Sequence, residues 1–181
     1  MDDRIRQLTD RDEIRDLMAR YARAVDRNDM DLLREVYHPD AYDDHGDYRG
    51  DLEGLVGYVT EKVGGAPQVM HFLGQILVEF GGPDVAVVET YFMTAHTLGP
   101  EASAAYGVED GGAGPLQLSM FGRYVDRVER RDGVWRIARR DTVFESTRVF
   151  TDAVPPIKPE WAQLRRDADD PIYRRRREAG V

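Results

Sequence analysis

The stretch FGRYVDRVERRDGVWRIARRDTVFE, residues 121–145, decides the fold that we expect for this chain. Both halves are rich in β-branched and aromatic residues, which favour extended strands. Asp132-Gly133 separates the two halves, and this dipeptide is typical of a two-residue β-hairpin turn. The stretch therefore predicts two long antiparallel strands, over residues 116–130 and 134–144.

Two more strands are predicted before this hairpin. Residues 69–80 and 85–97 are rich in apolar and β-branched side chains, and Gly81-Gly82-Pro83-Asp84 is a strong turn signal between them. Residues 99–115 are small, glycine-rich and acidic, which indicates an exposed loop. We therefore expect four long strands joined into one antiparallel sheet.

The N-terminal third of the chain predicts helices instead. Residues 10–27 place apolar side chains at helical spacing, so that they form one stripe, and further helices are predicted over residues 30–37 and 51–63. Pro39 ends the second of these, because the residue before a proline disfavours the helical conformation. Residues 41–48 are interpreted as a short polar strand or loop. The apolar stripe consists of Ile14, Leu17, Met18, Tyr21 and Val25.

Helices followed by antiparallel strands predict an α+β fold, in which three helices cover one face of a curved sheet and leave a pocket between them. A chain of 181 residues is expected to form one domain, which we place at residues 1–149. Residues 150–181 contain several prolines and the run Arg174–Arg177. We interpret them as a C-terminal extension or arm, with a short helix near residues 159–167.

The composition limits the partners and the cofactors. The net charge is −9, and an acidic surface repels phosphate backbones, so nucleic acid is not expected as a partner. The absence of cysteine excludes disulfides and Cys-ligated metal sites. No stretch is long and apolar enough for a membrane span, and the N-terminus lacks the apolar core of a signal peptide, so a cytoplasmic location without membrane binding is expected. Nucleotide-binding motifs are absent as well, and we expect no cofactor.

Four segments carry a family resemblance: IRDLMARYARAVDRNDMDLLREVYHPDA, DDHGDYRG, HFLGQ and the hairpin stretch quoted above, within about residues 8–148. Together they resemble the SnoaL-like branch of the nuclear-transport-factor-2-like superfamily. Its members include scytalone dehydratase, bile-acid 7α-dehydratase, hexachlorocyclohexane dehydrochlorinase, ketosteroid isomerase, polyketide cyclases and small subunits of ring-hydroxylating dioxygenases. The resemblance implies a cone of highly curved antiparallel sheet with three helices, in the manner of a cystatin-like α+β barrel. It also implies a mostly apolar cavity for a hydrophobic small molecule, and a homodimer or homotrimer.

The resemblance further implies a catalytic group. Dehydratase and dehydrochlorinase members carry an aspartate late in the first helix and a histidine at the start of a central strand, and Asp26 and His71 stand at these places. Tyr21 matches a pocket tyrosine of the bile-acid dehydratase. Helical rotation from Ile14 also puts Asp26 at the edge of the apolar stripe, from where its carboxylate can point toward a pocket. We expect His71 to act as the base, Asp26 to orient it and Tyr21 to polarise a substrate carbonyl. The competing interpretations are a solvated or helix-capping Asp26 and a hydrogen-bonded core His71.

A second polar group lies in residues 38–48. Asp43 and His45 alternate onto one face of a predicted strand, and by the family pattern this face looks into the cavity. We therefore expect Asp43, His45 and Tyr48 to line the substrate site, with an exposed loop as the alternative. His38, Asp43 and His45 are suitable metal ligands, but their spacing matches no standard metal signature, and no metal is expected.

Arginines of the last two strands are further candidates for substrate binding, since some relatives use one to orient an anionic or carbonyl group. Arg123 and Arg140 are named for this role, and a surface salt bridge is the alternative for each. Trp135 and Ile137 indicate which alternate residues of the last strand face inward, and one bulge would reverse this alternation. Arg140 is preferred over Arg123 on this ground.

These residues favour a cofactor-independent lyase or isomerase of the dehydratase type, acting on a hydrophobic cyclic small molecule. One alternative is a non-catalytic ligand-binding module, or an assembly module similar to a dioxygenase small subunit. Another is an epoxide hydrolase or cyclase on the same fold, in which Asp43 and Asp44 would carry the site.

Overall fold

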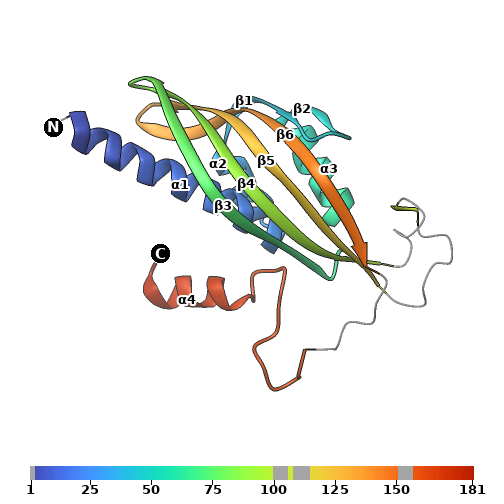
Figure 1. Ribbon diagram of the computed structural model, residues 1–181. Coiled ribbons are helices and arrows are strands. Elements are labelled where there is room, and N and C mark those ends of the chain that lie inside the picture. Colours follow the sequence, from blue (N-terminus) through green and yellow to red (C-terminus); the bar gives the residue numbers. More distant parts are fainter. Residues whose placement is uncertain (1–2, 100–105, 108–114, 151–156) are drawn as a thin grey trace.

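The computed structural model describes residues 3–99, 106–107, 115–150 and 157–181. In this part of the chain, three helices and six strands form the main body, and a fourth helix lies near the C-terminus (Figure 1). The elements are α1 Asp3–Arg27, α2 Met30–Val36, β1 Tyr37–Asp44, β2 Arg49–Asp51, α3 Leu52–Val63, β3 Gln68–Gly82, β4 Val85–Leu98, β5 Leu116–Arg131, β6 Val134–Phe150 and α4 Pro171–Ala179. The α+β class and the four long antiparallel strands are confirmed, whereas the loop expected at residues 99–115 lies largely outside the described residues.

The six strands form one sheet in the order β2-β1-β6-β5-β4-β3. The four long strands are antiparallel to their neighbours, as expected, and β1 pairs with β2 antiparallel but with β6 in parallel. α1 runs along β3 at one edge, and α3 lies beside β1 and β2 at the other (Figure 1). The helices thus cover the same face of an open, curved sheet.

The curvature has local causes. β3 has a bulge between Leu73 and Ile76, and the β5–β6 pairing shifts register twice. Bulges of this kind bend a strand and increase its twist. At one of these bends Gly122 is required, because a Cβ atom there would lie 2.2 Å from the carbonyl oxygen of Val143.

The turn and the apolar stripe behave as their residues predict. Asp132 and Gly133 both have positive φ, 52° and 80°, as a type I′ hairpin turn demands. Ile14, Met18 and Tyr21 are buried against the sheet together with the rest of the α1 stripe. Fully burying each aliphatic side chain contributes about 1.5–3 kcal/mol, so this stripe fixes α1 on the sheet.

Several boundaries differ from the expectations. α1 begins at Asp3 rather than near residue 10, and β6 extends to Phe150. β1 begins at Tyr37, so Pro39 lies inside a strand instead of ending a helix. Strands tolerate proline where the ladder is interrupted, and the pairing of β1 with β6 is irregular between Tyr37 and Tyr42.

The C-terminal helix also lies elsewhere than expected, at Pro171–Ala179 instead of near residues 159–167. Asp170 accepts a hydrogen bond from the Ile172 N–H, Pro171 occupies the first turn, and Gly180 ends the helix with φ 74°. These are standard start and stop signals, and they place Arg174–Arg177 on α4.

Several side chains attach this C-terminal segment to the main body: Tyr173 donates a hydrogen bond to Asp29, Asp170 pairs with Arg27, and Arg166 makes the largest set of contacts. Arg166 donates hydrogen bonds to the carbonyl oxygens of Val25 and Asp26 at the end of α1, both at 3.0 Å. It also donates to the carbonyl oxygens of Val63 and Ala66 at the end of α3. Helix C-termini attract cations, so one guanidinium holds two helix ends together. Among the helices in the described part of the chain, none combines the length and hydrophobicity that a membrane crossing requires.

Candidate active site

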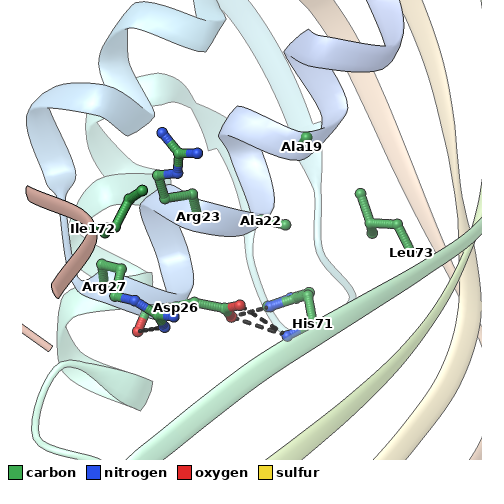
Figure 2. Close-up of a pocket in the computed structure, with 8 residues that line it drawn as sticks. All are labelled: Ala19, Ala22, Arg23, Asp26, Arg27, His71, Leu73 and Ile172. Carbon is green, nitrogen blue, oxygen red and sulfur yellow. Dashed lines mark hydrogen bonds and ion pairs between the residues drawn. The ribbon is translucent and has the colours of Figure 1, made fainter. Parts of the chain in front are cut away.

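Asp26 and His71 lie in direct contact between α1 and β3. The Asp26 Oδ1 atom is 2.6 Å from the His71 Nδ1 atom, and the backbone N–H of His71 donates to both carboxylate oxygens, at 3.1 and 3.0 Å. Figure 2 shows the carboxylate pointing from α1 toward β3. Both side chains are nearly buried, with exposed fractions of 10% for Asp26 and 6% for His71.

The fold places each member of this pair by a simple periodicity. Asp26 lies in the last turn of α1, at the edge of the buried stripe, and the helix stops at Asn28, which has φ 55°. His71 follows Val69 on the face of β3 that is turned to the helices, since side chains alternate along a strand. Asp26, at the edge of the apolar stripe of α1, and His71, near the start of β3, are therefore brought together.

The contact fixes the chemistry of the imidazole. An ionised carboxylate only accepts hydrogen bonds, so the short contact puts the proton of neutral His71 on Nδ1. The Nε2 atom then carries the free lone pair, and within the described residues it has no hydrogen-bond partner. A carboxylate that holds Nδ1 also stabilises the imidazolium that forms when Nε2 takes up a proton. The arrangement can therefore act as a general base.

A groove of about 450 Å³ opens beside this pair. It lies between α1 and β3, with Ile172 of α4 on the far side of α1's last turns (Figure 2). Ligand sites combine apolar walls with a few polar groups, and this groove has both. Its lining residues are Ala19, Ala22, Arg23, Asp26, Arg27, His71, Leu73 and Ile172.

Tyr21 lies five residues before Asp26 on α1 and is buried. Its ring meets the His71 ring edge-on at a centroid distance of 6.2 Å, and the Arg140 guanidinium lies 3.9 Å above its centre. Burial raises the pKa of Tyr21 to about 12, so the phenol stays protonated. Tyr124 and Arg140 are the polar neighbours of its hydroxyl. The structure therefore places the ring of Tyr21 beside His71, while its hydroxyl faces Tyr124 and Arg140.

A second aspartate–histidine contact lies at the end of β1. The His45 Nδ1 atom is 3.1 Å from Asp43 Oδ1, and the other oxygen of Asp43 accepts a hydrogen bond from the Tyr37 hydroxyl at 2.7 Å. Thr142 lies 3.3 Å from the same nitrogen of His45. Tyr48 is close by, because its ring stacks on Tyr58, which itself neighbours His45.

The remaining members of the expected polar group lie apart from this contact. The His38 Nε2 atom faces the carbonyl oxygen of Glu129 at 3.0 Å, away from Asp43. In the described ranges, no three His, Asp or Glu side chains are grouped closely enough to hold a metal ion.

The two candidate arginines lie on opposite faces of the sheet. Arg123 lies on the outer face and pairs with Glu89 and Glu145, so it does not reach the inner face on which His71 lies. Arg140 is completely buried on the inner face and pairs with Asp126. The register shift near Ala138 reverses the parity set by Trp135 and Ile137, and this is why Arg140 rather than Arg139 turns inward.

The sequence reasoning missed two residues beside His71. Thr94 and His96 are buried on the inner face of β4, and the His96 ring is 6.4 Å from the His71 ring. A signal was available in the sequence: every second residue of this strand, from Val88 through Thr90 and Phe92, faces the core, and the same alternation continues to Thr94 and His96. Burial lowers the pKa of His96 to about 4, with a smaller effect of the neighbouring His71 in the same direction.

Comparison with solved structures finds the same fold in several proteins. The hexachlorocyclohexane dehydrochlorinase LinA-type3 from Novosphingobium barchaimii superposes with a TM-score of 0.69 at 20% identity, covering 84% of this chain and 99% of that one. A putative scytalone dehydratase from Novosphingobium aromaticivorans has a TM-score of 0.65 at 18% identity, covering 86% and 95%. Kfla4162 from Kribbella flavida has a TM-score of 0.67 at 21% identity, covering 78% and 95%. At these identities the likeness establishes the fold and not the activity.

Sequence comparison leads to a family. The uncharacterized protein Rv2910c from Mycobacterium tuberculosis is 31% identical over 81 residues, which are 43% of this chain and 55% of that protein. The chain thus spans about half the length of the curated relatives it matches. The family model described as a SnoaL-like domain matches residues 6–141, well over half of the chain. The chain therefore belongs to the SnoaL-like family.

Proposed function

We propose that this protein is a cofactor-independent lyase or isomerase of the dehydratase type, which removes a proton from a hydrophobic cyclic small molecule. The observation that carries the proposal is the 2.6 Å contact between Asp26 and His71 beside a groove. It supports a base whose Nε2 atom has no hydrogen-bond partner within the described part of the chain and whose conjugate acid is stabilised by the carboxylate. General bases of this kind contribute about 10²–10⁴-fold to a rate.

The proposed elimination balances within the site. His71 Nε2 takes a proton from a carbon next to the one that bears the leaving group, and the C–H electron pair becomes the new double bond. The bond to the leaving group breaks at the same time. When that group is a hydroxyl, the imidazolium returns the proton to it and water leaves. Asp26 keeps its charge throughout and holds the ring in place.

Tyr21 takes a modified role in this proposal. Because its hydroxyl has Tyr124 and Arg140 as neighbours, it is better suited to hold the His71 ring than to touch the reacting carbonyl. Arg140 has the same supporting position behind Tyr21. Asp43, His45 and Tyr48 are proposed to line the substrate site from the side of β1.

Two structural neighbours support an elimination. Hexachlorocyclohexane dehydrochlorinase and scytalone dehydratase are both named for the removal of a small molecule from a substrate. By contrast, the epoxide hydrolase alternative needs Asp43 and Asp44 together. Asp43 is buried, whereas Asp44 pairs with the exposed Arg49. This separation favours the elimination.

The test uses proton exchange, which needs no knowledge of the natural substrate. The protein is incubated in D₂O with 2-tetralone, a bicyclic ketone, and exchange at the carbons beside its carbonyl is followed by NMR. We expect catalysed exchange, reduced about 10²–10⁴-fold in His71→Gln, with circular dichroism showing an intact fold. Exchange that is equally fast with His71→Gln would refute the proposed base.

The outer face of the sheet supports a further part of the proposal, which is self-association to a homodimer or homotrimer. Large apolar side chains are exposed there, and contiguous patches of this kind often mark protein–protein interfaces. They include Met70, Phe72, Leu77, Val87, Tyr91 and Met93. Sedimentation equilibrium of the protein and of Phe72→Glu tests it, with the wild type expected to sediment as an oligomer and the variant as a smaller species. If the face instead serves an assembly module, a different protein copurifies with the chain.

The cytoplasmic location stays a prediction.

A further inference from the structure

Two buried polar atoms on β4 have no partner and lie beside His71. The Thr94 Oγ1 atom and the His96 Nε2 atom are shielded from solvent, and neither has a hydrogen-bond partner among the residues that the structure describes. Both residues are more than nine-tenths buried, with exposed fractions of 2% and 6%. Leaving a polar group buried without a partner costs about 1–3 kcal/mol, so such a group needs an explanation in a native structure.

The sheet register puts both atoms next to the proposed base. Thr94 is the direct cross-strand partner of His71 in the β3–β4 pair, and His96 faces Val69 two residues away. Residues directly opposite in an antiparallel pair place their Cβ atoms about 4.5–5.5 Å apart on the same face. The His96 ring lies 6.4 Å from the His71 ring. Thr94 and His96 therefore flank the imidazole that would take the proton.

We propose that Thr94 and His96 form an oxygen-binding subsite, which holds a neutral carbonyl or hydroxyl oxygen of the substrate beside His71. This inference rests on the proposed function and adds the class of substrate to it. The oxygen would receive a hydrogen bond from the Thr94 hydroxyl or the His96 ring, and the adjacent carbon would then face His71. The activating or leaving group is accordingly an oxygen rather than a halogen.

The charge state of His96 agrees with a neutral ligand. Burial and the nearby His71 lower its pKa to about 4, so the ring is uncharged at neutral pH. A neutral imidazole donates from one nitrogen and accepts at the other, which suits a hydroxyl or a carbonyl. It supplies no positive charge to compensate a buried carboxylate, which would be costly to bind here.

β4 itself supplies a matched control. Thr90 lies on the same inner face, is fully buried and also has an unpartnered hydroxyl. It lies opposite Ile76 and Tyr124, on the far side of Phe92 from Thr94, and not beside His71. A hydroxyl that is unpartnered for reasons of packing alone should behave in the same way at both positions.

The experiment compares two probes of similar shape, 2-naphthol and 2-methylnaphthalene, by fluorescence titration at neutral pH. The readout is the ratio of the two dissociation constants in each variant relative to the wild type, because the probes differ in hydrophobicity. We expect Thr94→Val and His96→Phe each to shift this ratio about fivefold to tenfold against 2-naphthol, the equivalent of one hydrogen bond. His96→Gln keeps a donor and should retain most of the preference, and Thr90→Val should leave the ratio unchanged.

Two outcomes overturn the subsite. One is the absence of saturable 2-naphthol binding by the wild type, and the other is an unchanged ratio in both Thr94→Val and His96→Phe. The result is separate from the test of the base, since His71→Gln is expected to abolish proton exchange and to keep the preference for 2-naphthol. A preference that survives without exchange activity would thus support the subsite alone.

Discussion

Asp126 and Arg140 form a completely buried, bidentate ion pair between β5 and β6. The Nε and Nη2 atoms of Arg140 are each 2.7 Å from one carboxylate oxygen of Asp126, and neither side chain is exposed. The guanidinium also lies between the rings of Tyr21 and Tyr124, at 3.9 and 4.0 Å from their centres. Tyr21 touches His71 in turn, so the ion pair supports the wall behind the proposed base.

Breaking this ion pair is expected to be strongly destabilising. Arg140→Met leaves the carboxylate of Asp126 buried and unpaired, and such a change costs about 3–5 kcal/mol. The double variant Asp126→Leu with Arg140→Met removes both charges and should recover most of that loss. Urea unfolding followed by circular dichroism measures both.

Arg123→Met is the control for this prediction. Arg123 pairs with Glu89 and Glu145 on the outer face, where its side chain is about one third exposed. Surface pairs contribute only about 0–1 kcal/mol. Equal losses for Arg123→Met and Arg140→Met would contradict the importance given to burial.

The threonines of β4 give a second prediction, on the stability of the ligand-free protein. Thr94→Val removes an unpartnered buried hydroxyl at nearly constant volume, so the melting temperature should stay the same or rise. Thr97→Val should lower it, because the Thr97 hydroxyl bonds to both Gln68 and Gln117 at 2.8 Å. The expected loss is about 1–2 kcal/mol. A Thr94→Val protein that melts well below Thr97→Val would mean that the Thr94 hydroxyl has a partner in solution.

The contrast between these sites shows how far the sequence can lead. The pairing of Asp26 with His71 follows from periodicity within one helix and from the position of one strand, together with the family resemblance. The inward turn of Arg140 depends on a bulge near Ala138, which has no clear signal in the local sequence. The parallel pairing of β1 with β6 is a contact between distant segments, and no local pattern predicts its direction. His96 was missed because an alternating run of buried residues resembles ordinary core until the unpartnered atom is seen.

His96 gives a third prediction, on the dependence of stability on pH. Its pKa is about 4 in the folded protein and about 6.5 in an unfolded chain, so the unfolded state binds more protons between these values. Stability from this residue is therefore complete above about pH 6.5 and is lost as the pH falls toward 4. The size is on the order of 3 kcal/mol. His71, Asp26 and Arg166 are the titratable neighbours that act on it.

The measurement is a series of urea unfolding curves between pH 4 and pH 7, for the wild type and His96→Phe. We expect the wild type to lose stability toward acid more steeply than the variant over this range. Parallel curves would show that His96 is already protonated in the folded protein, or is exposed, and would remove the argument for a neutral ring.

Arg166 carries the last prediction, because it joins the C-terminal segment to the end of the helix that bears Asp26. Its guanidinium donates to carbonyl oxygens at the ends of both α1 and α3. Arg166→Met removes all of these charge-assisted hydrogen bonds at once and should cost about 2–3 kcal/mol. Hydrogen exchange should become faster at residues 22–27 and 60–64. Arg165→Met is the matched control, because Arg165 pairs with the exposed Asp167 and Asp169 and the substitution should change stability by less than about 0.5 kcal/mol. If the proton exchange of 2-tetralone becomes slower in Arg166→Met but not in Arg165→Met, the C-terminal segment holds Asp26 in place for catalysis. If the exchange rates and the stabilities of the two variants are equal, the segment contributes nothing to the site.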